Sequence, residues 1–234
     1  MSTKAILLKR NGNDGAKYDA LMKLNPVQMV TYTAPTTIPS ALSVTGTADY
    51  LLVTGGHGDF IASEPTKFND LPVAIAKSWI ASLDGEFQAV VLDTCFSSAF
   101  APFFLGHVPM GGHIVCAHGS GEGWAGGFDA GRTDDTVGDV LAEVVGNVDA
   151  MGLGFSSVSL LQRSDKGLVL YTANSGTTRT SGLSTRGDFG MDHDSATELA
   201  QLDSYLARRN ILVRPISNSD LRTRLKQMLT LPVK

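Results

Sequence analysis

Short apolar segments recur through the first half of this sequence, and stretches with helical periodicity lie between and after them. The strand-like segments are AILL (5–8), VQMVTY (27–32), YLLVT (50–54), FQAVVLD (87–93) and HIVCA (113–117). Most are continuously apolar, which is typical of strands covered on both faces in a parallel sheet. Residues 16–24, 71–83 and 135–148 carry apolar residues at helical spacing. The alternation predicts an α/β fold, a three-layer α/β/α sandwich with a mostly parallel central sheet.

The rest of the chain follows a different pattern. Residues 156–162 and 167–172 predict two strands joined by the turn RSDKG, which is a β-hairpin. Residues 173–194 are rich in Gly, Ser and Thr and predict a long loop. Residues 195–209 and 218–231 predict amphipathic helices. We therefore expect a main domain at 1–175, a flexible loop at 176–194 and a C-terminal helical segment at 195–234 packed on the domain.

Composition narrows the class of protein. The 234 residues carry a net charge of −4, without the basic patch that a general nucleic-acid binder would need. Two cysteines, Cys95 and Cys116, do not make a disulfide framework, which favours a reducing compartment. No apolar run is long enough for a membrane span, and the run after Met1 is too short for a signal peptide. We expect a cytoplasmic protein that binds neither nucleic acid nor membrane.

Two strand ends carry the residues of a thiol–imidazole site. His57, in GGHG (55–58), follows the strand at 50–54, and Cys95, in DTC (93–95), follows the strand at 87–93. The helix predicted between these strands makes them parallel, so both residues belong at the edge of the sheet where ligands bind. An imidazole can take the proton of a thiol and make it a nucleophile. We therefore expect Cys95 as the nucleophile and His57 as its acid–base partner.

The glycine after His57 fits the same chemistry. Attack on an amide creates an oxyanion, and backbone N–H groups are suitable donors for it. Gly58 leaves its N–H unshielded by a side chain, and the N–H of Cys95 is the second candidate donor. We expect Gly58 and Cys95 to form the oxyanion hole.

Together, the two motifs resemble those of the caspase–hemoglobinase superfamily (clan CD) of cysteine peptidases, most closely its metacaspase and paracaspase branch. That branch carries His-Gly after one core strand and Asp-x-Cys after the next. The resemblance covers about residues 4–172. It departs at Gly55, where metacaspases commonly have serine, and at residues 96–98, where Phe-Ser-Ser replaces the common His-Ser-Gly. The resemblance implies a caspase-like catalytic domain and a cysteine endopeptidase with a His/Cys dyad.

The resemblance also implies a pocket for the residue before the scissile bond. In the family, the aspartate of Asp-x-Cys helps to line this pocket and favours arginine or lysine, and Asp93 matches that position. The loop after the strand at 113–117 offers Ser120 and Glu122, and the loop after the first strand offers Asp14. A preference for aspartate would require an arginine in these loops, and none lies there.

The long loop at 173–194 has two interpretations. It holds Arg179 and Arg186, the residue type that such a pocket favours, so self-cleavage at these positions is one hypothesis. An ordinary linker to the C-terminal helices is the other.

Three functions remain open at this stage. The chain is an active cysteine peptidase with a protein or peptide substrate, an inactive caspase-like regulatory or binding protein, or a thiol hydrolase or transferase with another substrate. No metal or other cofactor is expected, because no pair among His57, Cys95, His113 and His118 has C-x₂-C or H-x₃-H spacing. Some metacaspases bind calcium, so the acidic residues of DDTVGD (134–139) leave calcium activation open. The sequence does not indicate which oligomeric state the protein adopts.

Overall fold

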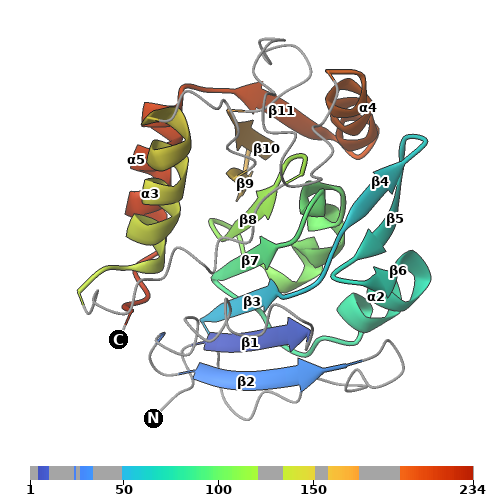
Figure 1. The fold of residues 1–234 in the computed structure, drawn as a ribbon, viewed down its shortest axis with the longest axis horizontal. Coiled ribbons are helices and arrows are strands. Elements are labelled where there is room, and N and C mark those ends of the chain that lie inside the picture. Colours follow the sequence, from blue (N-terminus) through green and yellow to red (C-terminus); the bar gives the residue numbers. More distant parts are fainter. Residues whose placement is uncertain are drawn as a thin grey trace.

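The computed structural model describes residues 5–10, 24, 27–33, 49–120, 134–150, 158–173 and 196–233. Its centre is an eight-stranded sheet with the strand order β11-β10-β9-β8-β7-β3-β1-β2 (Figure 1). The strands are β1 (Ala5–Arg10), β2 (Val27–Tyr32), β3 (Tyr50–Thr54), β7 (Ala89–Asp93), β8 (His113–Ala117), β9 (Val158–Ser164), β10 (Gly167–Thr172) and β11 (Ile211–Pro215). The helices are α2 (Val73–Ala81), α3 (Val137–Ala150), α4 (Ala196–Ala207) and α5 (Asn218–Met228), with the short 3₁₀ helices η3 (Ser97–Ala99) and η4 (Ala101–His107).

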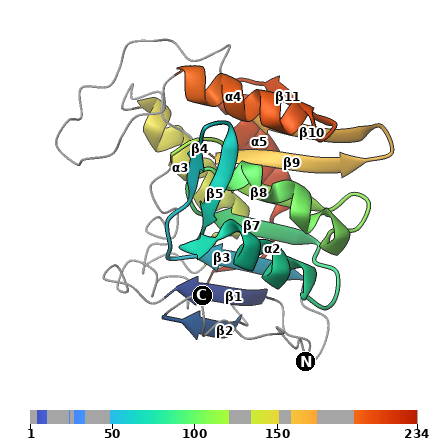
Figure 2. The same ribbon diagram turned by 90° about the vertical axis from the view of Figure 1, so that its right-hand side faces the viewer.

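The sheet is mixed, which corrects the expectation of a mostly parallel one. From β2 through β1, β3 and β7 to β8, each strand is parallel to the next. β9 is antiparallel to both β8 and β10, and β11 is parallel to β10. The reversal follows from the predicted hairpin, because a tight turn joins only antiparallel strands. In Figure 2, β9 runs opposite to β1 and β2.

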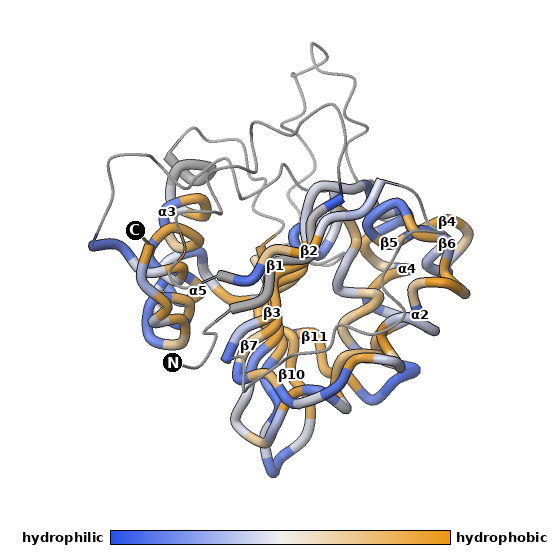
Figure 3. The backbone as a smooth tube through the Cα atoms, turned by 90° about the horizontal axis from the view of Figure 1, so that it is seen from below, coloured by the Kyte–Doolittle hydropathy of each residue, from blue (hydrophilic) through white to orange (hydrophobic). Residues whose placement is uncertain are grey.

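The central strands of the sheet are covered on both faces, and this gives the molecule three layers. In β7, Val90 and Leu92 belong to one apolar cluster, whereas Val91 belongs to the other. The first cluster includes buried residues of α2, η4 and α4, and the second includes buried residues of α3 and α5. Figure 1 shows α3 and α5 on one side of the sheet and α2 and α4 on the other. Figure 3 shows the same separation, with apolar segments along the central strands.

Most of the expected elements are confirmed. The strands predicted at 27–32, 50–54, 113–117 and 167–172 have those bounds in the structure. The helices predicted at 71–83, 135–148, 195–209 and 218–231 correspond to α2, α3, α4 and α5. Residues 16–23 of the first predicted helix lie outside the described residues, and Leu24 forms an isolated bridge with Val233.

The sequence analysis missed four strands. Three of them, β4 (Asp59–Ile61), β5 (Glu64–Phe68) and β6 (Leu71–Pro72), form a small antiparallel sheet on the same side as α2 and α4 (Figure 2). The fourth, β11, lies between the two C-terminal helices and extends the central sheet. The C-terminal segment therefore supplies a strand as well as helices. In the described part of the chain, no helix is long and apolar enough to cross a membrane.

Candidate active site

The two motifs follow neighbouring strands of the central sheet. β3 and β7 are parallel, and their last paired residues are Thr54 and Asp93. The Thr54 hydroxyl donates a hydrogen bond of 2.7 Å to Oδ2 of Asp93. His57 lies three residues beyond the end of β3 and Cys95 two residues beyond the end of β7. The expectation that the strands are adjacent and joined through the helix α2 is confirmed.

The backbones of the two motifs are in direct contact. A Cβ atom placed on Gly58 would collide with the carbonyl oxygen of Cys95, so only glycine allows this approach. Next to this contact, the Thr94 hydroxyl donates a hydrogen bond of 3.0 Å to the carbonyl oxygen of Gly56. The His-Gly and Asp-x-Cys motifs therefore form one continuous surface at the edge of the sheet.

Asn69 supports the loop that carries His57. Its Oδ1 accepts a 2.7 Å hydrogen bond from the Gly56 N–H, and its Nδ2 donates to the Thr54 carbonyl at 3.2 Å and to the Tyr32 hydroxyl at 2.6 Å. Asn69 is fully buried and has a positive φ of 51°, a conformation that Asn adopts more readily than most residues. The neighbouring N–H of Asp70 donates to the His57 carbonyl at 2.7 Å. The Asn69 side chain thus fixes the backbone on either side of Gly55.

Tyr32 completes this support from β2. Its hydroxyl donates to the carbonyl of Asn69 at 2.6 Å while accepting from the amide of the same residue. Burial and the nearby Asp70 carboxylate raise the pKa of the Tyr32 hydroxyl, so that it keeps its proton and remains a donor. The sequence analysis found neither residue, because both act through contacts distant in the chain.

The residues after Cys95 are held by β8 and the loop that follows it. Phe96 has a φ of 55°, and its N–H donates to the Gly119 carbonyl at 2.8 Å. The Ser97 hydroxyl donates to the Leu92 carbonyl and accepts from the Ala117 N–H, both at 2.8 Å. A left-handed conformation at a bulky residue costs energy and persists where its surroundings impose it, often next to a functional group. The turn after Cys95 is therefore tightly specified.

The two cysteines differ in accessibility. Cys95 is half-buried at the sheet edge, whereas Cys116 is fully buried inside β8. Burial raises the pKa of the Cys116 thiol well above its usual range, which keeps it protonated and unreactive. His57 is exposed. The expectation that Cys116 belongs to the core is confirmed, whereas Cys95 is only partly buried.

The predicted pocket is described only in part. Asp93 is 8% exposed and accepts a hydrogen bond from Thr54, and Ser120, three residues after β8, is half-buried. Glu122 and Asp14 lie outside the described residues, as do the candidate self-cleavage residues Arg179 and Arg186.

One cation at this edge was not anticipated. The sequence analysis found no arginine in the pocket loops, but Arg10 is the last residue of β1. Its Nε lies 3.1 Å from Oδ2 of Asp70, next to the residues that support the His57 loop. The positive charge of Arg10 is therefore compensated within the protein.

The described ranges contain no obvious set of metal ligands. There, no group of three or more His, Cys, Asp or Glu side chains is placed to hold a metal ion. Asp139, in the acidic segment at 134–139, caps the start of α3, where its Oδ2 accepts from the N–H and hydroxyl of Thr136 at 3.1 and 2.7 Å.

Comparison with known proteins assigns no family to the chain. No protein-family model matches it, and no curated protein is significantly similar to it.

Proposed function

We propose that this protein is a cysteine endopeptidase with a caspase-like fold, in which Cys95 is the nucleophile and His57 its acid–base partner. The observation that carries the proposal is the contact between Gly58 and the Cys95 backbone, at the ends of two adjacent parallel strands. The proposal is supported by this contact, because Cys95 is partly exposed and the Gly58 backbone follows His57 directly. A nucleophile, a base and backbone donors are the parts that acyl transfer needs.

The reaction follows from these parts. His57 accepts the proton of the Cys95 thiol, and the thiolate attacks the carbonyl carbon of the scissile amide. The N–H groups of Gly58 and Cys95 stabilise the negative oxygen of the tetrahedral intermediate. The protonated His57 then gives its proton to the leaving amine, and an acyl-enzyme thioester remains. Water, activated by His57, hydrolyses the thioester and restores the thiol.

We further propose that the enzyme cleaves after arginine or lysine. Asp93 carries a carboxylate at the edge of the sheet and is almost completely buried. A cationic side chain that leaves water needs a compensating charge, and a carboxylate supplies it. The Arg10 guanidinium is paired with Asp70, so its charge is compensated within the protein and does not favour an acidic substrate.

The experiment is hydrolysis of a fluorogenic peptide library by the intact protein and by single variants. Cys95→Ala and His57→Ala should each remove nearly all hydrolysis, because each loses one half of the dyad. Cys116→Ala is the matched control, since that thiol lies in the core. Hydrolysis should concentrate on peptides with arginine or lysine before the cut.

Four results would contradict the proposal. Full activity in Cys95→Ala, or inactivity in a folded Cys116→Ala, would mean that the nucleophile is wrongly assigned. A profile dominated by aspartate or by large apolar residues would end the proposed specificity. A protein that alkylates at Cys95 but cleaves no peptide would favour a non-peptide substrate or a regulatory role.

A further inference from the structure

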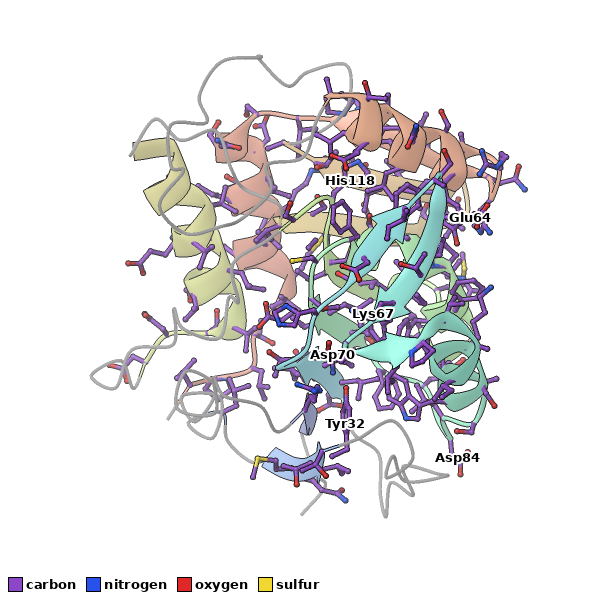
Figure 4. The ribbon with its side chains drawn as sticks, turned by 45° about the vertical axis from the view of Figure 1, so that its right-hand side comes forward. Tyr32, Glu64, Lys67, Asp70, Asp84 and His118 are labelled. Carbon is purple, nitrogen blue, oxygen red and sulfur yellow. The ribbon has the colours of Figure 1, made fainter. Side chains whose placement is uncertain are left out.

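A row of hydrogen bonds connects the helix α4 to the turn that follows Cys95. Oδ1 of Asp203, on α4, lies 2.7 Å from Nε2 of His118, just beyond β8. Nδ1 of the same ring lies 3.1 Å from the hydroxyl oxygen of Ser98, in η3. In Figure 4, His118 lies beside α4. Asp203 and His118 are 85 positions apart in the sequence, so only the fold brings them together.

These three side chains do not form a second hydrolytic site. Ser98 and His118 are both 0% exposed, so no substrate reaches the hydroxyl. A carboxylate only accepts, so we assign the ring proton to Nε2, which leaves Nδ1 to accept from Ser98. Because both ring nitrogens are engaged, His118 is not the base for Cys95. Its geometry suits support of the neighbouring turn.

The same short segment also holds that turn through its backbone. The carbonyl of Gly119 accepts from the N–H of Phe96, and the N–H of Ala117 donates to the Ser97 hydroxyl, both at 2.8 Å. Residues 117–119 therefore contact each of the three residues that follow Cys95. The His118 ring, between its two partners, lies in the same segment that contacts the turn.

A second path from α4 ends at the same turn. Tyr205 packs edge-on against Phe60, with 5.6 Å between ring centroids, and Phe60 stacks on Phe96 at 6.3 Å. Tyr205 is fully buried and Phe60 is 5% exposed. The hydrogen bonds from Asp203 through His118 end at Ser98, and the ring contacts from Tyr205 through Phe60 end at Phe96. Both sets of contacts therefore link α4 to the turn that follows Cys95.

We propose that His118 and Asp203 are positioning residues, which hold the Cys95 thiol and its backbone N–H in the arrangement that reacts. This inference rests on the proposed function, because it assigns a task to residues around the same nucleophile. It gives one residue of α4, Asp203, a supporting role at the site. The physical reason is that losing either partner leaves a buried polar group unpaired, which the turn relieves by moving. Small displacements of a reacting group are costly for rate.

The experiment uses the full chain and compares Asp203→Ala, Asp203→Asn and His118→Ala with Ser204→Ala. Ser204 follows Asp203 on α4 and is exposed, so it is the matched control. The first readout is the rate of Cys95 alkylation by iodoacetamide, followed by mass spectrometry. The second is kcat and KM on the best library peptide. Urea unfolding reports whether each variant is folded.

We expect Asp203→Ala and His118→Ala to lower kcat about ten- to a hundredfold with little change in KM, and to slow alkylation of Cys95. Asp203→Asn should recover most of the rate, because its Oδ1 still accepts from the imidazole. Ser204→Ala should behave as the native protein. If His118→Ala does not fold, Asp203→Ala decides, since its side chain is 21% exposed and tolerates truncation better.

A folded Asp203→Ala variant with native kcat and native alkylation overturns the inference and leaves the peptidase intact. An equal loss in Asp203→Asn and Asp203→Ala also overturns it, because the retained acceptor would then have no role. If the native protein cleaves no peptide while Asp203→Ala still slows alkylation, positioning stands and the peptidase assignment fails. The two hypotheses are therefore separable.

Discussion

Gly58 is the residue on which the contact between the two motifs depends. An added Cβ there would meet the Cys95 carbonyl oxygen and carbon, which are backbone atoms that cannot rotate away. We expect Gly58→Ala to separate the two loops. The predicted result is a loss of hydrolysis of at least tenfold and a destabilisation of about 1–3 kcal/mol, as for other overpacked sites. Peptide hydrolysis and urea unfolding measure the two effects.

Gly106 is the control for the Gly58→Ala substitution. It is exposed, and a Cβ added to it would meet no atom within 4 Å. Gly106→Ala should therefore keep native activity, with a change in stability within about 0.5 kcal/mol. Native behaviour of Gly58→Ala would show that the close approach is not needed for reaction.

The sequence analysis named His57 and Cys95 as the candidate dyad but did not find the residues that hold their loops, for a physical reason. His57 and Cys95 follow strands directly, and strand ends are visible in a pattern of apolar runs. Asn69 and His118 act through contacts that depend on which strands are neighbours and where each side chain points. Periodicity carries neither kind of information. The FND segment at 68–70 is a recognisable turn signal, but its sequence does not indicate that Asn69 binds the Gly56 N–H.

Short or polar strands explain the missed elements. β4 has three residues and β5 reads EPTKF, with a proline and two charges, so neither produces an apolar run. β11 has the sequence ILVRP and lies between two helices whose periodicity dominates the surrounding segment. By contrast, β3 and β7 are buried at every position, and their sequences are correspondingly apolar.

The pair of helices α3 and α5 offers a test at the level of elements. Gly138 lets α3 approach α5 so closely that a Cβ would lie 2.5 Å from the Leu225 carbonyl oxygen and 2.8 Å from that of Leu229. The Gly138 N–H also donates to the Leu229 carbonyl at 3.2 Å. Gly138→Ala should force the helices apart and lower the free energy of unfolding by about 1–3 kcal/mol.

Gly146, two turns further along α3, is the matched comparison. A Cβ there would meet the Arg222 guanidinium, whose nearest atom is 2.7 Å away but lies at the end of a flexible side chain. The arginine can move, and alanine favours a helix over glycine by about 1 kcal/mol. Gly146→Ala should therefore be neutral or stabilising in urea unfolding. Equal destabilisation by both variants would contradict this account of the helix contact.

At the level of the whole molecule, the C-terminal segment is joined to the rest on both faces and at one edge of the sheet. β11 pairs with β10 from Leu168–Ile211 to Thr172–Pro215. Leu202 and Leu206 of α4 belong to one apolar cluster, and Leu221 and Leu225 of α5 belong to the other. The N–H of Val233 also donates to the Asp135 carbonyl at 2.7 Å, ahead of α3. A cut between β10 and α4 would leave all of these contacts in place.

This arrangement predicts the outcome of self-cleavage after Arg179 or Arg186. Mass spectrometry should find fragments that end at these arginines in the native protein and none in Cys95→Ala, because the cut requires the nucleophile. The two fragments should elute together in size-exclusion chromatography without denaturant and separate only in urea, since burial of apolar side chains holds them. An active native protein that stays intact would favour the linker interpretation of residues 173–194. Fragments that separate without denaturant would contradict a core shared by both parts of the chain.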